Sequence, residues 1–167
     1  IFLARLIATG TSNEPREITW KSIEEVDSLR VPSETRQLLN KAQNLLDDRI
    51  QKAEQQAISL LGKVVFVTVN RPIGTNHAGI HYQKNYGYIE NVIGKDGDSL
   101  DAYILGVDKP VNSFEGLCVA VIKRTNDLDD KLVVVPQNTS IDSEKIRKDT
   151  NFVEKYFESE LLLMHDY

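Results

Sequence analysis

The sequence predicts an α+β protein, in which a small β-barrel with flanking helices follows an N-terminal helical extension. Three observations favour this fold class. Apolar residues recur at helical spacing up to Leu61, the chain then changes to short β-branched runs separated by turn residues, and helix start signals return after residue 140. A chain of 167 residues can bury one sizeable core. We therefore divide it into an extension, residues 1–62, and a barrel with a C-terminal helix, residues 63–167.

The extension is expected to be mostly helical. The apolar opening, residues 1–8, suits a strand or a short helix, and Thr19 can cap a helix over residues 20–29. Residues 33–61 are expected to form a long helical stretch, folded as a hairpin, with Gly62 at its C-cap. The apolar stripe of this stretch consists of Leu38, Ala42, Leu45, Leu46, Ile50, Ala53, Ala57 and Leu61. The stripe predicts either packing on the chain's own fold or the seam of a homo-oligomer.

Five β-branched runs predict the strands of the barrel. Gly, Pro, Asn and Asp stand between these runs, which are residues 64–69, 86–89, 100–105, 117–122 and 132–135. After the last run, Ser140 or Asp142 can start a short helix. Asn151 and Glu154 form a capping box for a further helical segment that reaches Leu161. The fold would therefore end in helix.

Charge and cysteine content narrow the function classes. The chain has 20 Lys plus Arg against 25 Asp plus Glu, a net charge of −5, so non-specific binding to nucleic acid or to an anionic membrane is not expected. An OB-type nucleic-acid module is disfavoured because it needs a basic groove. Cys118 is the single cysteine, so no internal disulfide can form and a cytoplasmic protein is predicted. The start at Ile1 leaves an upstream segment or a removed signal peptide open.

Six central residues carry three carboxylates, Asp96, Asp98 and Asp101, in a loop between two predicted strands. So dense a cluster needs cations or open water around it, because like charges raise one another's pKa. Residues 126–131 form a second acidic group, which alone would be a solvated hairpin tip. If both loops meet on one face of the barrel, they supply the oxygen ligands that Mg²⁺ or Mn²⁺ prefers. The sequence thus predicts a metal-dependent enzyme.

Two other metal sites fit the sequence less well. A calcium loop needs an acidic or amide residue at its fifth position and Gly at its sixth, where this chain has Leu100 and Asp101. His77 and His81 are four residues apart, as zinc ligands on a helix are, but Gly79 and the Pro and Gly upstream predict a loop. Either histidine could instead contact a phosphate.

Four segments together resemble the soluble family I inorganic pyrophosphatases. They are Asn-Tyr-Gly-Tyr-Ile at 85–89, Asp-Gly-Asp-Ser-Leu-Asp at 96–101, Ala-Tyr-Ile-Leu at 102–105, and Asp-Asp-Lys-Leu-Val-Val-Val-Pro at 129–136. Their order and spacing agree with the family over residues 64–136. The resemblance implies an OB-like five-stranded barrel. It also implies Mg²⁺-dependent hydrolysis of pyrophosphate to two phosphates by a metal-activated water, with Mn²⁺ as the alternative ion.

The resemblance further implies roles for single residues. Asp98 would take the proton from the attacking water, and Lys131 and Tyr86 would be the other catalytic residues. Lys131 would also bind phosphate, together with Tyr82 in the pocket and Arg71 at a strand end. The metal ligands would be Asp96, Asp101, Asp129 and, in a shortened second loop, Asp127 or Asn126.

The chain departs from the family pattern in its phosphate contacts. An early Glu and a Lys-x-Glu pair have no counterparts, and a Tyr-Lys pair near the C-terminal helix becomes Glu160-Leu161. Each lost charge-assisted bond weakens binding by about 1.5–3 kcal/mol. Two alternatives to a pyrophosphatase therefore stay open. One is a hydrolase of another phosphoanhydride, and the other is a catalytically silent barrel that acts as a binding module.

Overall fold

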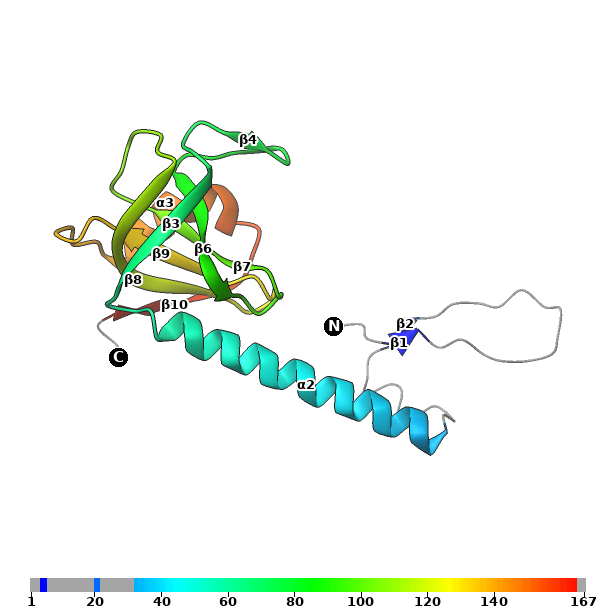
Figure 1. Ribbon diagram of the computed structural model, residues 1–167. Helices are drawn as coiled ribbons and strands as arrows, with labels where there is room; N and C mark the ends of the chain where they lie inside the picture. The colour runs from blue at the N-terminus through cyan, green and yellow to red at the C-terminus, as the bar shows by residue number, and fades with distance from the viewer. Residues whose placement is uncertain (1–3, 6–19, 22–31, 165–167) are drawn as a thin grey trace. The chain divides into compact units, whose positions relative to one another are not determined.

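The computed structural model describes residues 4–5, 20–21 and 32–164, and its contacts divide the chain into two units, residues 1–48 and 49–167 (Figure 1). In the first unit, strand β1 (Ala4–Arg5) pairs with strand β2 (Trp20–Lys21). The helix predicted over residues 20–29 therefore does not begin at Trp20, and the rest of that range lies outside the described residues. The strand predicted in the opening segment is found at Ala4–Arg5.

Helix α2 (Ser33–Ile58) is continuous, so the predicted helical hairpin is wrong. The physical reason is in the sequence, because residues 34–61 contain no Gly or Pro that could turn the chain. Ala53 and Ala57 near the end of the helix are buried. Gly62 adopts a left-handed conformation, with a φ of 74°, where the chain turns into the barrel. No described helix combines the length and the apolar run that a membrane crossing requires.

Five strands close into a mixed barrel, as predicted. In ring order each strand pairs with the next, and β8 closes the ring by pairing with both β9 and β3 (Figure 1). The β7–β9 pair is parallel and the other pairs are antiparallel. In that order the strands are β3 (Val64–Arg71), β6 (Asn85–Ile93), β7 (Ser99–Ile104), β9 (Lys131–Val135) and β8 (Ser113–Arg124).

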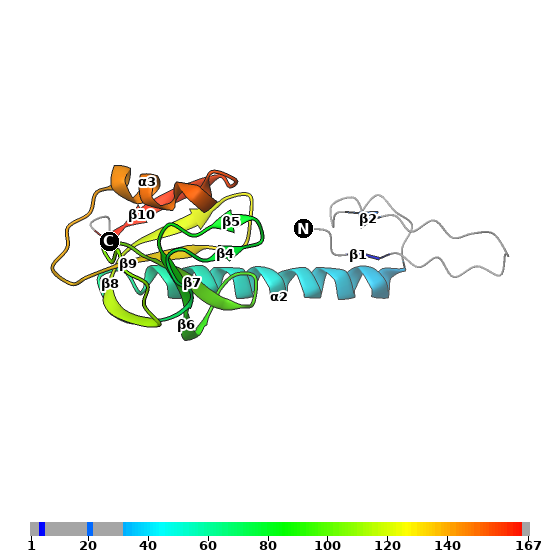
Figure 2. The ribbon, with the colours of Figure 1, turned by 90° about the horizontal axis from the view of Figure 1, so that it is seen from above.

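The C-terminal part differs from the prediction. Helix α3 (Ser143–Glu154) begins after Asp142, whose carboxylate accepts a hydrogen bond from the Lys145 backbone at 2.7 Å. The further helix predicted up to Leu161 is wrong, because strand β10 (Ser159–Leu163) pairs with the second half of β8. Figure 2 shows α3 and β10 on the same side of the barrel.

A short hairpin follows β3. It consists of β4 (Asn76–His77) and β5 (Ile80–His81), in which Asn76 pairs with His81. Ala78 and Gly79 at its tip both have positive φ. His77 and His81 thus lie on the two paired strands of a hairpin. They therefore do not have the one-turn spacing that two zinc ligands have on a helix.

Strand β9 is buried at every position because it packs on both of its faces, whereas β3 alternates and leaves Val64 and Phe66 exposed. Alternate residues of β7 and β9 belong to two different core clusters. Tyr103 and Val133 pack with α3 through Phe152, whereas Ala102 and Leu132 belong to the cluster that contains Ala57 of α2. Strands β7 and β9 therefore pack on one face with the cluster that includes α3 and on the other with the cluster that includes the end of α2.

Candidate active site

The first acidic loop is held in shape by its own backbone. Between β6 and β7, the Gly94 N–H donates to the Asp98 carbonyl at 2.8 Å, and Gly97 has the positive φ, 98°, that the turn requires. The Asp98 N–H donates to the Asp96 carboxylate at 3.0 Å. Asp101 lies on β7 itself, where it pairs with Tyr88 of β6 and Lys131 of β9. The three carboxylates are therefore presented from a rigid strand end.

The second acidic loop lies beside the first. Asp129 and Asp130 directly precede β9, and a buried ion pair joins Lys95 of the first loop to Asp130 at 2.8 Å. The Asp130 carboxylate also accepts a hydrogen bond from the backbone N–H of Arg124 at 2.9 Å. Burial raises the pKa of the Asp130 carboxyl, and the bond to Lys95 opposes that rise. This pair fixes the separation of the two loops.

Four carboxylates from the two loops line one pocket of about 320 Å³. Its lining comprises Asn70, Arg71, Tyr88, Asp96, Asp98, Ser99, Asp101 and Asp129. Five residues predicted for the site, Arg71 and these four aspartates, are thus brought to the same cavity. Asp98 is exposed, and none of the described residues hydrogen-bonds to its carboxylate. Its oxygens are therefore free to bind a ligand or a proton.

Lys131 and Tyr86 lie beneath this pocket. The Lys131 side chain is 1% exposed, and its ammonium donates to Asp101 at 2.8 Å and forms an ion pair with Asp129. The Tyr86 hydroxyl donates to the same Asp101 oxygen at 2.6 Å. Burial, followed by the nearby charge of Asp101, raises the pKa of Tyr86 well above its usual range, so this hydroxyl stays a donor. Lys131 and Tyr86 both bind Oδ2 of Asp101, which fixes this carboxylate and leaves its other oxygen open to the pocket.

Arg71 stands at the end of β3, as predicted, and reaches the pocket from its other side. Its guanidinium lies over the rings of Tyr82 and Tyr86, 5.4 and 5.1 Å from their centroids. Its Nη2 is 3.4 Å from Nε2 of His77 in the β4–β5 hairpin. Tyr82 is buried under Arg71 and does not line the pocket. The two tyrosines therefore support the one cationic side chain that lines this cavity within the described residues.

Asp127 points elsewhere. Its Oδ2 accepts from Arg124 Nη1 at 3.1 Å and its Oδ1 accepts the Leu128 N–H at 2.8 Å, so it does not line the pocket. Sequence reasoning missed Arg124, which is buried and bridges the second acidic loop to Glu154 of α3. A signal was present, since Arg124 ends an apolar strand run just before the acidic group. Lys95, directly before Asp96, was missed as well.

The carboxylates fit a divalent cation by their chemistry, because Mg²⁺ and Mn²⁺ prefer several hard oxygen ligands. Asp101 and Asp129 each use one oxygen on Lys131, and their side chains are 23% and 33% exposed. Within residues 32–164, no three acidic or histidine side chains already form a complete ligand set. Burial raises the pKa of the Asp129 carboxyl, and the charge of Lys131 opposes this. A cation near Asp129 would favour its charged form in the same way.

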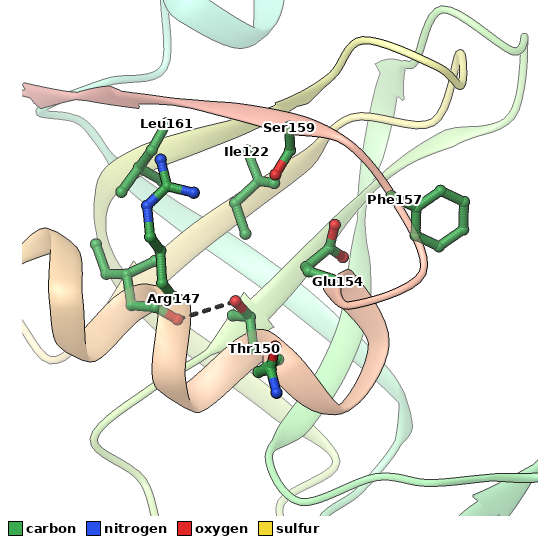
Figure 3. Close-up of a pocket in the computed structure, with 9 residues that line it drawn as sticks. Ile122, Arg147, Thr150, Glu154, Phe157, Ser159 and Leu161 are labelled. Carbon is green, nitrogen blue, oxygen red and sulfur yellow. Dashed lines mark hydrogen bonds between the residues drawn. The ribbon is translucent and has the colours of Figure 1, made fainter.

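A second pocket, of about 280 Å³, lies between α3 and β10 (Figure 3). Figure 3 shows Glu154 at the end of α3, between Ser159 and Phe157. Glu154 also binds Arg124 and the Tyr103 hydroxyl. This second pocket is therefore connected to the second acidic loop through Arg124, but none of the aspartates of that loop lines it.

Comparisons with known proteins agree with this geometry. The family model "Inorganic pyrophosphatase" matches residues 50–161. Inorganic pyrophosphatase from Ehrlichia chaffeensis is 16% identical in sequence, with 64% of this chain and 89% of that one covered and a TM-score of 0.51. The enzyme from Helicobacter pylori is 17% identical, with 62% and 86% covered and a TM-score of 0.50. No curated protein matches.

These structural likenesses, at such low identity, show the fold. The family match covers more than half of the chain, including both acidic loops and all five barrel strands. The matched segment also contains the four sequence motifs that resemble the family, at residues 85–89, 96–101, 102–105 and 129–136. The chain therefore belongs to the family I inorganic pyrophosphatases.

Proposed function

We propose that this protein hydrolyses pyrophosphate to two phosphates with divalent cations bound at Asp96, Asp101 and Asp129. The observation that carries the proposal is the single pocket in which these carboxylates, Asp98 and Arg71 converge. Cations bound there, Mg²⁺ or Mn²⁺, would make water more acidic and neutralise charge on the leaving phosphate. Pyrophosphate is the substrate that the family implies.

Asp98 is the residue that accepts the proton of the attacking water. Its carboxylate is exposed in the pocket and engaged by none of the described side chains, whereas Asp101 and Asp129 are each tied to Lys131. When the water's oxygen attacks one phosphorus, the bond from the bridging oxygen to that phosphorus breaks and phosphate leaves. The proton lost by the water passes to a free carboxylate oxygen, and Asp98 offers one.

Arg71 binds a phosphoryl group. A guanidinium presents a planar fork of donors that matches phosphate oxygens, and the rings of Tyr82 and Tyr86 hold this one in place. Lys131 contributes its charge from below, between Asp101 and Asp129, and Tyr86 fixes the orientation of Asp101. The protein's own side chains therefore hold Asp101 and Asp129 in position.

Phosphate release tests the proposal. Purified protein is incubated with pyrophosphate, with Mg²⁺ or Mn²⁺ or without a divalent ion, and Asp98→Asn is compared with Asp108→Asn, which changes a carboxylate that is 80% exposed outside the pocket. Metal-dependent release is expected, with a loss of about 10²–10⁴-fold in Asp98→Asn. Asp108→Asn should retain full activity. Equal rates in Asp98→Asn and the unsubstituted protein would exclude the assigned base.

Because the chain lacks several phosphate contacts of the family pattern, the same assay is also run with other phosphoanhydrides. Glu160 and Leu161, which stand where the family has a Tyr-Lys pair, lie on β10 and do not line the acidic pocket. Tripolyphosphate and a nucleoside diphosphate are therefore assayed in parallel. Faster release from either one would support the altered hydrolase. Absence of release from every substrate, in a protein that still binds Mn²⁺, would support the silent barrel.

A further inference from the structure

Arg124 carries a positive charge inside the acidic site. It is the last residue of β8, its side chain is 3% exposed, and its guanidinium contacts three carboxylates. Nε and Nη2 donate to the two oxygens of Glu154, at 3.0 and 2.8 Å. Nη1 reaches Asp127 and Asp129 of the second acidic loop, at 3.1 and 3.3 Å. The guanidinium thus makes a bidentate ion pair with Glu154 of α3 and shares Nη1 between two aspartates of the loop. It thereby joins α3 to the second acidic loop.

The surroundings of Arg124 hold its charge in place. The guanidinium carbon lies 3.5 Å from the centroid of the Phe157 ring. Burial is the largest single influence and works to lower the pKa of Arg124, but the hydrogen bond to Glu154 together with the charges of Glu154 and Asp129 outweighs it and the pKa is raised. Glu154 itself accepts the Tyr103 hydroxyl at 2.6 Å, and Figure 3 shows it anchored at the end of α3. This cation is permanent and does not depend on any ion in solution.

The loop next to Arg124 is pinned at its start. The Thr125 N–H donates to the Glu158 carbonyl at 2.8 Å, and the Asn126 side chain accepts the Glu158 N–H at 3.1 Å. At its end, the ion pair between Asp130 and Lys95 ties it to the first acidic loop. Asp127 and Asp129 therefore lie beside Arg124 through fixed backbone, and their approach to it does not require a flexible tip.

Both oxygens of Asp127 are already engaged by the protein. One of its oxygens binds Arg124 and the other accepts the Leu128 N–H. Asp129 shares its Oδ2 between Arg124 and Lys131, while its Oδ1 has no hydrogen bond within the described part of the chain. Arg124 thus neutralises the far side of the loop, and only Asp129 faces the pocket.

We propose that Arg124 is a built-in cation of the acidic site, which takes the place of a divalent ion between Asp127 and Asp129. The inference rests on the proposed binding of divalent cations at Asp96, Asp101 and Asp129. Its consequence concerns metal stoichiometry: the second loop, despite its carboxylates, binds no ion of its own while Arg124 is present. Arg124 is a positioning residue here, because it acts through Asp127 and Asp129.

Mn²⁺ binding without substrate tests this inference. Titration calorimetry and the electron paramagnetic resonance signal of free Mn²⁺ give the number of ions bound to the unsubstituted protein and to Arg124→Met. An additional bound Mn²⁺ is expected in Arg124→Met, since Asp127 loses its cation and Asp129 keeps Lys131 but loses Arg124. Adding Asp127→Asn to that variant should abolish the additional ion. An unchanged number of ions in a folded Arg124→Met protein would overturn the inference.

Two further variants keep the test decisive. Arg124→Met leaves the buried Glu154 carboxylate with only its bond from Tyr103, so Arg124→Met/Glu154→Gln is the variant used if the single one fails to fold. It should gain the same additional ion, and an unchanged number would overturn the inference. Lys123→Met is the matched control, because its side chain pairs with Glu54 of α2 at 2.5 Å and should give no additional ion.

Failure of the inference and failure of the proposed function differ in their readouts. If the unsubstituted protein binds no Mn²⁺, the proposed metal site at Asp96, Asp101 and Asp129 is overturned, and with it the inference that rests on it. If the unsubstituted protein binds Mn²⁺ and Arg124→Met binds no more, only the role assigned to Arg124 is overturned.

Discussion

Asn85, the first residue of the family motif on β6, is fully buried and uses its whole amide group. Its Oδ1 accepts the backbone N–H groups of Ile73 and Val111, at 3.0 and 3.3 Å. Its Nδ2 donates to the carbonyls of Val107 and Lys109, at 3.1 and 2.9 Å. One side chain thereby joins the segment after β3 to the segment after β7. Since Ile73 follows Arg71 by two residues, this amide supports the side of the pocket that Arg71 lines.

Asn85→Leu is expected to lower the free energy of unfolding by about 4 kcal/mol, because four partly buried backbone groups lose their partner at about 1 kcal/mol each, the low end of the usual range. Urea unfolding followed by circular dichroism measures it. The matched control is Asn138→Leu, at an exposed asparagine after β9, for which a change within about 0.5 kcal/mol is expected. A cost below about 1 kcal/mol for Asn85→Leu would contradict the assigned role.

At the scale of single residues, the sequence predicted the pocket aspartates and Arg71 from a motif and from strand ends. It did not predict Arg124, because an arginine followed by a polar turn is usually solvated. Its partner Glu154 is 30 positions further along the chain, on a helix whose contacts no local pattern specifies. For the same reason Asp127 was predicted as a metal ligand, and only the fold shows both of its oxygens engaged.

At the scale of elements, the local patterns predicted all five barrel strands and α3, because alternation and capping residues are local signals. The predicted helical segment reached Leu161, but residues 159–163 form β10, since their partner is the second half of β8, where Leu161 pairs with Ile122. β8 has twelve residues because its first half pairs with β3 and its second with β10. Such long-range pairing decides between helix and strand where short apolar runs are ambiguous.

Gly87 of β6 lies against β3 with no room for a side chain. It pairs with Val69, and a Cβ atom at this position would lie 2.1 Å from the Thr68 carbonyl oxygen, in backbone that cannot turn away. Gly87→Ala must therefore separate the two strands that carry Arg71 and Tyr86. We expect a loss of about 3 kcal/mol in the free energy of unfolding, measured by urea denaturation.

Gly79→Ala is the control for Gly87→Ala. Gly79 lies at the tip of the β4–β5 hairpin with a φ of 78° and nothing within 4 Å of an added Cβ, so it reports the cost of the left-handed backbone alone, about 1 kcal/mol. If Gly87→Ala costs no more than Gly79→Ala, the close approach of β3 to β6 does not limit stability.

At the scale of the whole molecule, the division into an extension and a barrel stays a prediction, and its boundary can be sharpened. The sequence placed it at residues 62 and 63, since Gly62 ends the helical pattern. The apolar stripe of this helix predicts that one of its faces is covered, but does not tell which part of the protein covers it. In the structure, the end of α2 belongs to the barrel unit: Ala57 is buried in a core cluster against which Leu60 and Leu61 pack. Arg49 also donates to the Lys95 carbonyl at 3.3 Å.

Two fragments test where the barrel unit begins. Residues 49–167 should fold cooperatively, because they keep the last turns of α2 with Ala53, Ala57 and the pair between Glu54 and Lys123. Residues 63–167 lose this apolar cover, including Leu60 and Leu61, and should be about 4 kcal/mol less stable, from roughly 1.5–3 kcal/mol for each large apolar side chain removed from its packing. Urea unfolding of both fragments measures the difference. Equal stabilities would place the boundary at Gly62, as the sequence alone predicts, and would mean that the end of α2 covers the core without stabilising it.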